Sequence, residues 1–403
     1  MHYGVLAMEN KLVTLGKVAE YIKNHVDIDC SNSHEYVSTE NLQSNKLGVS
    51  FPSSSYPTSG KVGAYQTGDI LISNIRPYFK KIWQADKSGT NSPDVLNIRA
   101  TSRALTQDFL AVVLSDDRFF DFMMATSKGT KMPRGDKQAI MQYEFILPTL
   151  STQQKVVHIV RAIDTKTELN QQINKNLMKL GIILTVHEIN SGRVRVKPLG
   201  ELEQLLTVSD HVANGSFKSL KENVTIVDEP NFALFLRNKD LKQDLMGDRR
   251  WVTEHSYKFL KKSHLHGGEV IISNVGDVGS VHRVPYLAEK MVAGNNVIFM
   301  QSDEHWITDY LYLYFRSNIG QHDISAITSG SAQQKFNKTD FRAIKVPFVN
   351  ESFVKETLTP ILRSIDANKA ENQSLTQLRD LLLPKLLAGD IDLSNIETVM
   401  NNA

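Results

Sequence analysis

The sequence predicts a mixed α/β fold of the α+β class, in which two homologous domains are separated by two long helices. Two observations lead to this prediction. Several short motifs recur in the same order about 200 residues apart, a period that indicates a duplicated domain and not a solenoid. Two stretches carry apolar residues at the alternating spacing of four and three that is typical of a coiled-coil seam. We therefore expect pseudo-twofold symmetry, with domains at 1–150 and 191–350, helices at 151–190 and 351–392, and a C-terminal tail at 393–403.

The repeat is clearest in a short strand that follows a turn. Residues 68–74 read Gly-Asp-Ile-Leu-Ile-Ser-Asn and return at 268–274 as Gly-Glu-Val-Ile-Ile-Ser-Asn. A short apolar, β-branched run after a glycine is typical of a buried strand. Residues 294–300 predict a further turn and strand of this kind.

The other elements follow in matching order in each half. We expect an opening strand and short helix, then the β-rich middle, one helix, a glycine-bearing loop, and a strand that ends in proline. The expected ranges are 12–22 and 199–208 for the opening, 106–126 and 307–319 for the helix, 126–130 and 328–331 for the loop, and 144–148 and 343–347 for the last strand.

The two long helices have recognisable ends. Ser151 with Gln154 predicts a capping box at the start of the first helix. Asn350 is the expected N-cap of the second, and Gly389 its expected C-terminal stop. Pro360 lies inside the second pattern, so we expect a kink there or a helix that starts nearby.

Polar residues interrupt both seams near mid-length. Thr167 and Asn170 do so in the first helix, Asn368 and Asn372 in the second. If the helices pair antiparallel, these positions meet, and buried polar pairs set the register. The alternative is two separate amphipathic helices, each packed on its own domain. The narrow seam favours pairing, because a globular helix usually needs a wider apolar face.

Composition limits the classes of protein that fit. The 403 residues suffice for two or three domains, and the formal net charge is only +2. Any phosphate-binding surface must therefore come from local patches. No apolar run reaches the length of a membrane span, and the N-terminus does not resemble a secretory signal. The single cysteine, Cys30, rules out an internal disulfide and fits a cytoplasmic protein.

Catalytic signatures are missing from the sequence. There is no phosphate-binding Gly-x4-Gly-Lys-Ser/Thr loop, and no Asn/Asp-Pro-Pro-aromatic sequence of an amino-methyltransferase. His264 and His266 lack the cysteines or carboxylates that would complete a zinc site. Asp94 lacks the matching acidic strand of a nuclease centre. We expect a non-catalytic chain that holds no metal and no cofactor.

A basic, glycine-flanked loop is the first candidate for nucleic-acid contact. Lysines and arginines bind phosphates without regard to sequence, and amide side chains read base edges. The alternative is a solvated loop that binds no ligand, but the recurrence of the loop in both halves favours contact with DNA. The candidates are Lys128, Lys131, Arg134, Lys137 and Gln138 in the first half, and Gln333, Gln334, Lys335, Asn337 and Lys338 in the second.

Two further basic patches are weighed evenly between a DNA contact and a solvated surface. The first follows the strand at 68–74, and its equivalent in the second half is far less basic. The other is diluted by nearby aspartates. Their members are Arg76, Tyr78, Lys80 and Lys81, and Arg249, Arg250, Lys261 and Lys262.

The chain resembles the specificity subunit of type I restriction–modification systems. The resemblance rests on Leu-Pro-Thr-Leu-Ser-Thr-Gln-Gln at 147–154 with its helix, and on Val-Pro at 346–347 with the helix after it. That second helix ends in Leu-Arg-Asp-Leu-Leu-Leu-Pro-Lys-Leu-Leu-Ala-Gly at 378–389, an ending characteristic of the family. The second helix lacks the glutamine pair of the first, which is a departure from the pattern.

The resemblance implies a function in bacterial defence. Each recognition domain would read one half of a split double-stranded DNA target, and the antiparallel helices would act as a spacer. It implies two methylation subunits that use S-adenosylmethionine, and a restriction subunit that uses ATP and magnesium. The seam from Val156 to Leu184 would span roughly 42 Å, or about 12 base pairs. The alternatives are a protein-interaction scaffold without DNA binding, and an enzyme with an unrecognised active site.

Overall fold

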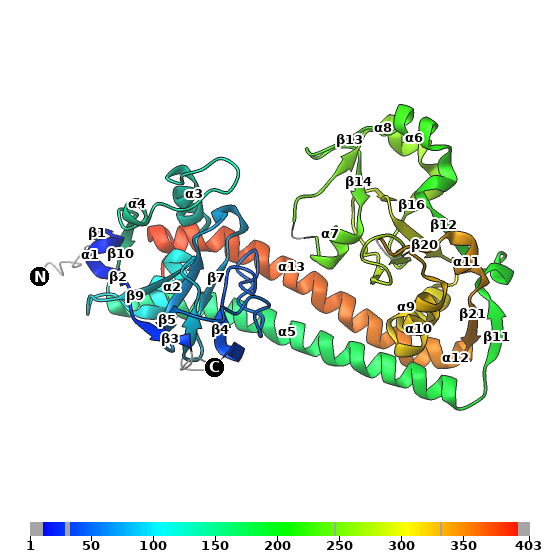
Figure 1. Ribbon diagram of the computed structural model, residues 1–403, viewed down its shortest axis with the longest axis horizontal. Coiled ribbons are helices and arrows are strands. Elements are labelled where there is room, and N and C mark those ends of the chain that lie inside the picture. The colour runs from blue at the N-terminus through cyan, green and yellow to red at the C-terminus, as the bar shows by residue number, and fades with distance from the viewer. Residues whose placement is uncertain (1–10, 29–32, 246, 331–332, 394–403) are drawn as a thin grey trace, which may run out of the picture. The chain divides into compact units, whose positions relative to one another are not determined.

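The computed structural model describes residues 11–28, 33–245, 247–330 and 333–393, and it forms two compact units (Figure 1). Unit 1 consists of Met1–Glu168 with Gln373–Ala403, and unit 2 of Leu169–Asn372. Each long helix is therefore divided between the two units. Most of the expected C-terminal tail lies outside the described residues.

Unit 1 is built on three antiparallel or mixed sheets. The expected strand after Gly68 is confirmed as β6 (Ile70–Ser73), whose four residues are all buried. Its sheet has the order β2-β9-β6-β7, with β2 (Ala19–Tyr21), β9 (Val95–Ala100) and β7 (Ile82–Gln84). A second sheet contains β3 (His25–Asp27), β5 (Lys61–Tyr65), β8 (Gly89–Asn91) and β4 (Tyr36–Val37), and a third pairs β1 (Lys11–Thr14) with β10 (Glu144–Leu147).

Unit 2 repeats this plan. Its four-stranded sheet has the order β12-β20-β17-β18, with β12 (Thr207–Asp210), β20 (Val297–Gln301), β17 (Val270–Ser273) and β18 (Val281–Arg283). β11 (Arg195–Pro198) pairs with β21 (Lys345–Phe348), as β1 pairs with β10. The remaining sheet joins β13 (Ile226–Val227), β15 (Trp251–Val252), β14 (Ala233–Leu236), β19 (Met291–Ala293) and β16 (His264–Leu265). The duplicated α+β fold is thus confirmed.

The single helix expected in each half is wrong, because each is two helices. In unit 1, α2 (Gln107–Leu114) ends before α3 (Asp117–Ala125), and the Asp116 carboxylate accepts from the Arg118 amide at 2.8 Å. In unit 2, α9 (His305–Arg316) ends before α10 (Asn318–Ile327), where the Ser317 hydroxyl accepts from the Gly320 amide. A cap of this kind starts a new helix inside a stretch whose apolar pattern continues.

Shorter helices surround these sheets. Unit 1 has α1 (Leu15–Val18) and α4 (Lys137–Ile140), and unit 2 has α6 (Phe217–Asn223), α7 (Asn238–Lys242), α8 (Glu254–Phe259) and α11 (Lys338–Ala343).

The first long helix, α5 (Leu150–Asn190), begins one residue earlier than expected. The expected capping box is wrong: the Thr149 hydroxyl accepts from the Thr152 amide at 3.3 Å, which makes Thr149 the cap. Gln153 is fully buried and donates to the carbonyl of Ala104 at 2.7 Å. The first glutamine of the pair is therefore a structural residue that ties α5 to the start of α2.

The second long helix starts as expected at Asn350, whose side chain accepts from the Ser352 amide at 2.8 Å. A short α12 (Glu351–Phe353) and a π-helical turn (Val354–Leu358) precede α13 (Thr359–Ala388). Pro360 lies directly after this π-helical turn, at the change to α-helical hydrogen bonding, where the helix accommodates a residue that has no amide proton. Gly389 adopts a φ of 77° and ends the helix, as expected.

The helices pair antiparallel within each unit, which confirms the expected coiled coil. In unit 1, Asp164 of α5 accepts from Arg379 of α13 at 3.3 Å. In unit 2, Asn170 donates to Asn372 at 2.9 Å, so these two residues meet across the seam, and their role in setting the register stays a prediction. Asn368, however, donates to Asn174, a seam residue that sequence reasoning missed.

The remaining register residue is Thr167, whose hydroxyl bonds within α5. It donates to the Ile163 carbonyl of its own helix at 2.9 Å. Each helix also packs on the domain that precedes it: Val156 and Val160 belong to the core of unit 1, and Leu362 and Ile365 to the core of unit 2. The two readings of the helices are therefore combined in one structure.

Candidate DNA interface

In unit 1 the basic loop after α3 folds back on itself and is fastened to the end of β6. The backbone groups of Lys128 and Arg134 exchange two hydrogen bonds of 2.9 Å, and Gly129 makes the turn with a φ of 92°. The Arg76 amide donates to the Pro133 carbonyl at 2.8 Å. Two basic patches that are 50 residues apart in the sequence thus form one surface.

Unit 2 contains the same construction at the matching residues. Ser329 and Lys335 exchange two backbone hydrogen bonds of 2.9 Å, and Gly330 has a φ of 102°. The Phe336 amide donates to the Asn274 carbonyl at 3.1 Å, as the Gly135 amide donates to the Asn74 carbonyl in unit 1. The loop that the sequence repeat indicated is therefore repeated in its backbone hydrogen bonds as well.

The cations of the unit 1 loop differ in how free they are. Lys128 is 81% exposed but pairs with Asp136 at 2.5 Å, and Arg134 pairs with Asp94 at 3.2 Å. Lys131 is exposed and has no ionic partner within the part of the chain that the structure describes. The exposed ion pairs of Lys128 and Arg134 are weak, and each cation can exchange its carboxylate partner for a DNA phosphate. All three can face a DNA backbone.

Within the patch after β6, the cations have two different roles. Arg76 is exposed, and its side chain has no partner among the described residues. Lys80 pairs with Asp117 at 2.9 Å, and the Lys81 ammonium donates to the Thr39 carbonyl at 2.5 Å. Burial lowers the pKa of Lys81 below its usual range. The two lysines hold the turn, and Arg76 and Tyr78 are the members that face solvent.

In unit 2, some of the predicted loop residues are exposed and others have structural partners. Gln333, Gln334 and Lys335 are exposed around the bridge. Asn337 caps α11 by accepting from the Asp340 amide at 2.8 Å, and Lys338 pairs with Asp210 at 3.0 Å. The first three are free to contact bases or phosphates, whereas the last two also have structural partners.

The patch predicted from Arg249, Arg250, Lys261 and Lys262 does not form one surface in the fold. Arg250 precedes β15 and pairs with Asp228 at 2.7 Å, and Arg249 donates to the Leu245 carbonyl at 3.2 Å. Lys261 and Lys262 are exposed and precede β16, which is separated from β15 by β14 and β19. Three strand steps correspond to roughly 14 Å. Their DNA contact stays a prediction, but for two separate surfaces.

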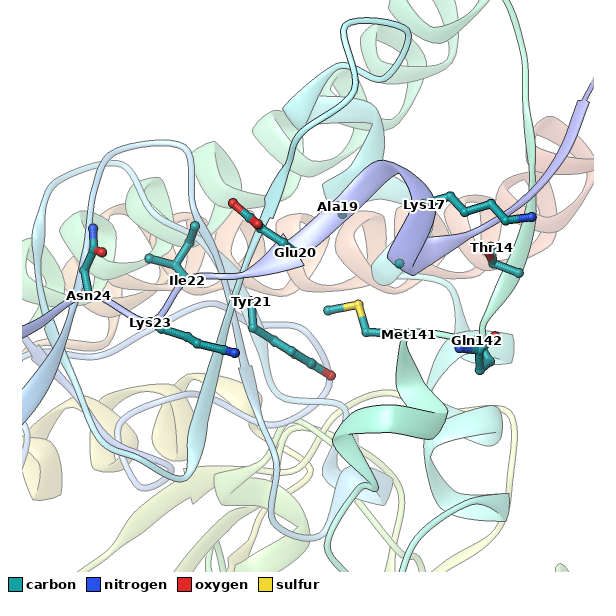
Figure 2. A pocket seen from close by; sticks show the side chains of 11 residues that line it. Thr14, Lys17, Ala19, Glu20, Tyr21, Ile22, Lys23, Asn24, Met141 and Gln142 are labelled. Carbon is teal, nitrogen blue, oxygen red and sulfur yellow. The ribbon is translucent and has the colours of Figure 1, made fainter.

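A groove of about 710 Å³ in unit 1 is lined mostly by residues between Thr14 and Asn24, and by Met141 and Gln142 directly after the end of α4 (Figure 2). Lys17, Tyr21 and Lys23 line it, and the Tyr21 hydroxyl donates to the Lys137 carbonyl at 3.1 Å. Lys137 and Gln138 are both exposed at this edge. The groove is joined to the predicted loop surface through Tyr21 and Lys137, and its charge is mixed because Glu20 also lines it.

Sequence reasoning missed Lys17 and Lys23 as members of this surface. Within the described residues neither side chain has an ionic partner, whereas the first helical lysine of unit 2, Lys338, pairs with Asp210. No local signal marks them, because the two lysines are separated by Glu20 in the sequence and line one groove only in the folded chain.

Among the residues that the structure describes, no group of three His, Cys, Asp or Glu side chains is arranged to hold a metal ion. No helix in those same residues has the length and apolar character needed to cross a membrane.

Comparison with known proteins gives a consistent result. The sequence profile described as "Type I restriction modification DNA specificity domain" matches residues 9–179 and 213–378. The chain is similar to the type I restriction enzyme HindI specificity subunit of Haemophilus influenzae, with 22% identity over 94% of this chain and 99% of that protein. In fold it is similar to the crystal structure of the type I restriction–modification S subunit from M. genitalium, with a TM-score of 0.52, 14% identity, and coverage of 96% and 98%.

Proposed function

The chain belongs to the type I restriction–modification DNA specificity family, and on this premise we propose that each of its two units reads one half of a bipartite DNA target. The observation that carries the proposal is the duplicated loop. Paired backbone hydrogen bonds close the loops between Lys128 and Arg134 and between Ser329 and Lys335, and a further backbone bond fastens each closure to the end of a central strand. Exposed cations and amides held in this way can lie against phosphates and base edges. A scaffold that binds only proteins would not need them.

The enzymatic steps belong, in this proposal, to partner subunits. S-adenosylmethionine would bind the methylation subunits, and ATP and magnesium the restriction subunit. This chain would contribute recognition alone, in the cytoplasm where the DNA is. The absence of nucleotide-binding and methyltransferase motifs from the sequence supports this division.

The long helices supply a docking surface for these partners. In unit 2, Leu169, Ile173, Leu180 and Ile183 of α5 are each at least 39% exposed and follow a helical spacing. Exposed apolar rows of this kind mark protein interfaces. In unit 1, Leu378 and Leu381 of α13 are exposed in the same way. One apolar surface per unit supports two methylation subunits.

Replacing Leu180 and Ile183 by glutamate should abolish this docking in unit 2. Two carboxylates in an apolar interface should weaken copurification with the methylation subunit at least tenfold. Methyl transfer to target DNA, measured with labelled S-adenosylmethionine, should fall with it, and the isolated chain should transfer none. The charge-matched control, Gln171→Glu with Lys175→Gln, changes residues outside the apolar row. Equal losses in both variants would remove this row from the interface.

We further propose that the helix pair sets the spacing between the two half-sites. Inserting seven residues after Glu168 in α5 and after Asn372 in α13 keeps the antiparallel seam in register and adds about 10 Å. The preferred target should gain about three unspecified base pairs between unchanged half-sites. Affinity should also fall, since three base pairs rotate one half-site by about 100°.

Selection from a DNA pool with a randomised spacer measures this change directly. A matched chain with seven residues added after Gly192, outside the paired helices, should keep the original spacing. If the chain with lengthened helices folds and still selects the original spacing, the helices do not determine it.

A further inference from the structure

The turn after β6 is held in a strained conformation that its counterpart avoids. Arg76 has φ 51° and ψ 63°, and Lys80 has φ 50° and ψ 49°, both in the left-handed region that side chains disfavour. The residue at the position of Arg76 in unit 2 is Gly276, with φ 82°. Strain of this kind persists only where the surroundings enforce it, and it concentrates at functional sites.

Several contacts enforce the conformation. The amides of Asn45 and Lys46 donate to the carbonyls of Phe79 and Lys80 at 2.8 and 2.9 Å. The ammonium groups of Lys46 and Lys80 both pair with Asp117, at 2.7 and 2.9 Å. The turn is therefore rigid before any ligand arrives.

The turn exposes two aromatic rings, those of Tyr78 and Phe79, beside basic side chains. Tyr78 is 47% and Phe79 37% exposed, with ring centroids 4.6 Å apart. Arg76 is exposed next to them, and its amide joins the turn to the basic loop at Pro133. Aromatic surface that remains in water is unfavourable, and cations around it favour a ligand that is both anionic and stacked.

Unit 2 has no such pair at this position. Residues 276–279 read Gly-Asp-Val-Gly, and Asp277 pairs with Lys242 at 3.1 Å. The equivalent turn is thus small and acidic, and its one carboxylate is already bound. The two units share a loop but differ in the turn beside it.

We propose that the Tyr78–Phe79 turn is a wedge that inserts between adjacent base pairs of the half-site read by unit 1, while unit 2 reads its half without unstacking. This rests on the proposed DNA-reading function. Apolar side chains inserted at one base step separate it and kink the duplex, and a pre-formed wedge loses little entropy on insertion. The surrounding cations, Arg76 and Lys131, would hold the phosphates on either side.

The test uses the full chain in complex with its methylation subunits and a target duplex with 2-aminopurine at successive steps of both half-sites. The fluorescence of 2-aminopurine rises on unstacking. The wild-type complex should raise it at one step in one half-site only. Tyr78→Ala with Phe79→Ala should remove that rise and weaken binding about tenfold. Phe217→Ala, which removes an aromatic ring that is 80% exposed in unit 2, should change neither.

A rise that persists at that same step in the double variant would show that the aromatic pair does not cause the unstacking, and it would overturn the wedge. So would target binding by the wild type without any such rise. Failure of the wild-type complex to prefer its target over unrelated DNA would instead overturn the proposed function.

A second variant keeps the test decisive if the double variant does not fold. Arg76→Gly relieves the left-handed strain, so its melting temperature should rise while its affinity for target DNA falls about tenfold. A gain in stability without a loss of affinity would show that the strained arginine does not serve DNA binding.

Discussion

Replacing Arg283 by methionine should lower the free energy of unfolding of unit 2 by about 3–5 kcal/mol. Arg283 lies in β18 with its side chain 8% exposed, and it donates to Asp309 of α9 at 2.7 Å and contacts Asp366 of α13. Asp309 is 1% exposed and also accepts from the Thr359 hydroxyl at 2.7 Å. Without the guanidinium, a buried carboxylate is left without its countercharge, which is far more costly than the loss of a surface pair.

Urea unfolding followed by circular dichroism measures this change. Adding Asp309→Leu to the Arg283→Met chain removes the uncompensated carboxylate and should recover part of the stability. Because the network ties β18 and α9 to α13, the single variant should also bind its target less tightly.

The repeat supplies a matched control in unit 1. Gln84, which is paired with the first residue of β6 as Arg283 is with the first residue of β17, donates to Asp108 at 2.8 Å, and Arg161 of α5 donates to the same carboxylate at 2.6 Å. These groups are far less buried than those of unit 2, since the Arg161 side chain is 56% and the Asp108 side chain 41% exposed. Arg161→Met should therefore cost less than about 1 kcal/mol. Equal costs for the two arginines would mean that burial does not decide the strength of these networks.

Replacing Lys128, Lys131 and Arg134 by alanine should weaken DNA binding on the order of a hundredfold at physiological salt. Each lost phosphate contact flattens the log–log dependence of affinity on salt by about 0.9. The total should lie between about 0.9 and 2.7, because Lys128 and Arg134 must first leave Asp136 and Asp94. Binding to a target duplex across a salt series gives this slope.

The matched control is a triple alanine variant of Lys11, Lys61 and Arg103, which are exposed elsewhere in unit 1. It changes the net charge equally and should leave the slope nearly unchanged. An unchanged slope in the loop variant would remove this loop from the interface and favour a scaffold that does not bind DNA there. The melting temperatures of both variants should stay close to that of the wild type, since none of the six side chains is buried.

Much of the fold could be predicted from the sequence because its signals are local. The buried strand at 70–73, the stop at Gly389 and the start at Asn350 each depend on a few neighbouring residues. The long helices and their antiparallel pairing follow from a spacing that is repeated over many turns. The duplication itself needs only a comparison of the chain with itself.

Local signals predicted helix boundaries poorly where the apolar pattern continues past a residue that caps a new helix. The expected helices at 106–126 and 307–319 are each divided, because Asp116 and Ser317 offer the backbone a side-chain acceptor that starts a new helix. The seam partner Asn174 was missed for a related reason. Which polar residues meet across two helices depends on the register, and the register is a property of the pair.

The candidate interface depended most on tertiary structure. The sequence by itself determined the basic loops, their repetition and the absence of catalytic motifs. Only the fold brought the turn at Arg76 against the loop at Pro133, separated Lys261 from Arg250, and gave Lys80, Lys81 and Lys338 structural partners. The reason is physical: a charge is available to a ligand only if the folded chain leaves it exposed and at most weakly paired, and its partners come from distant parts of the sequence.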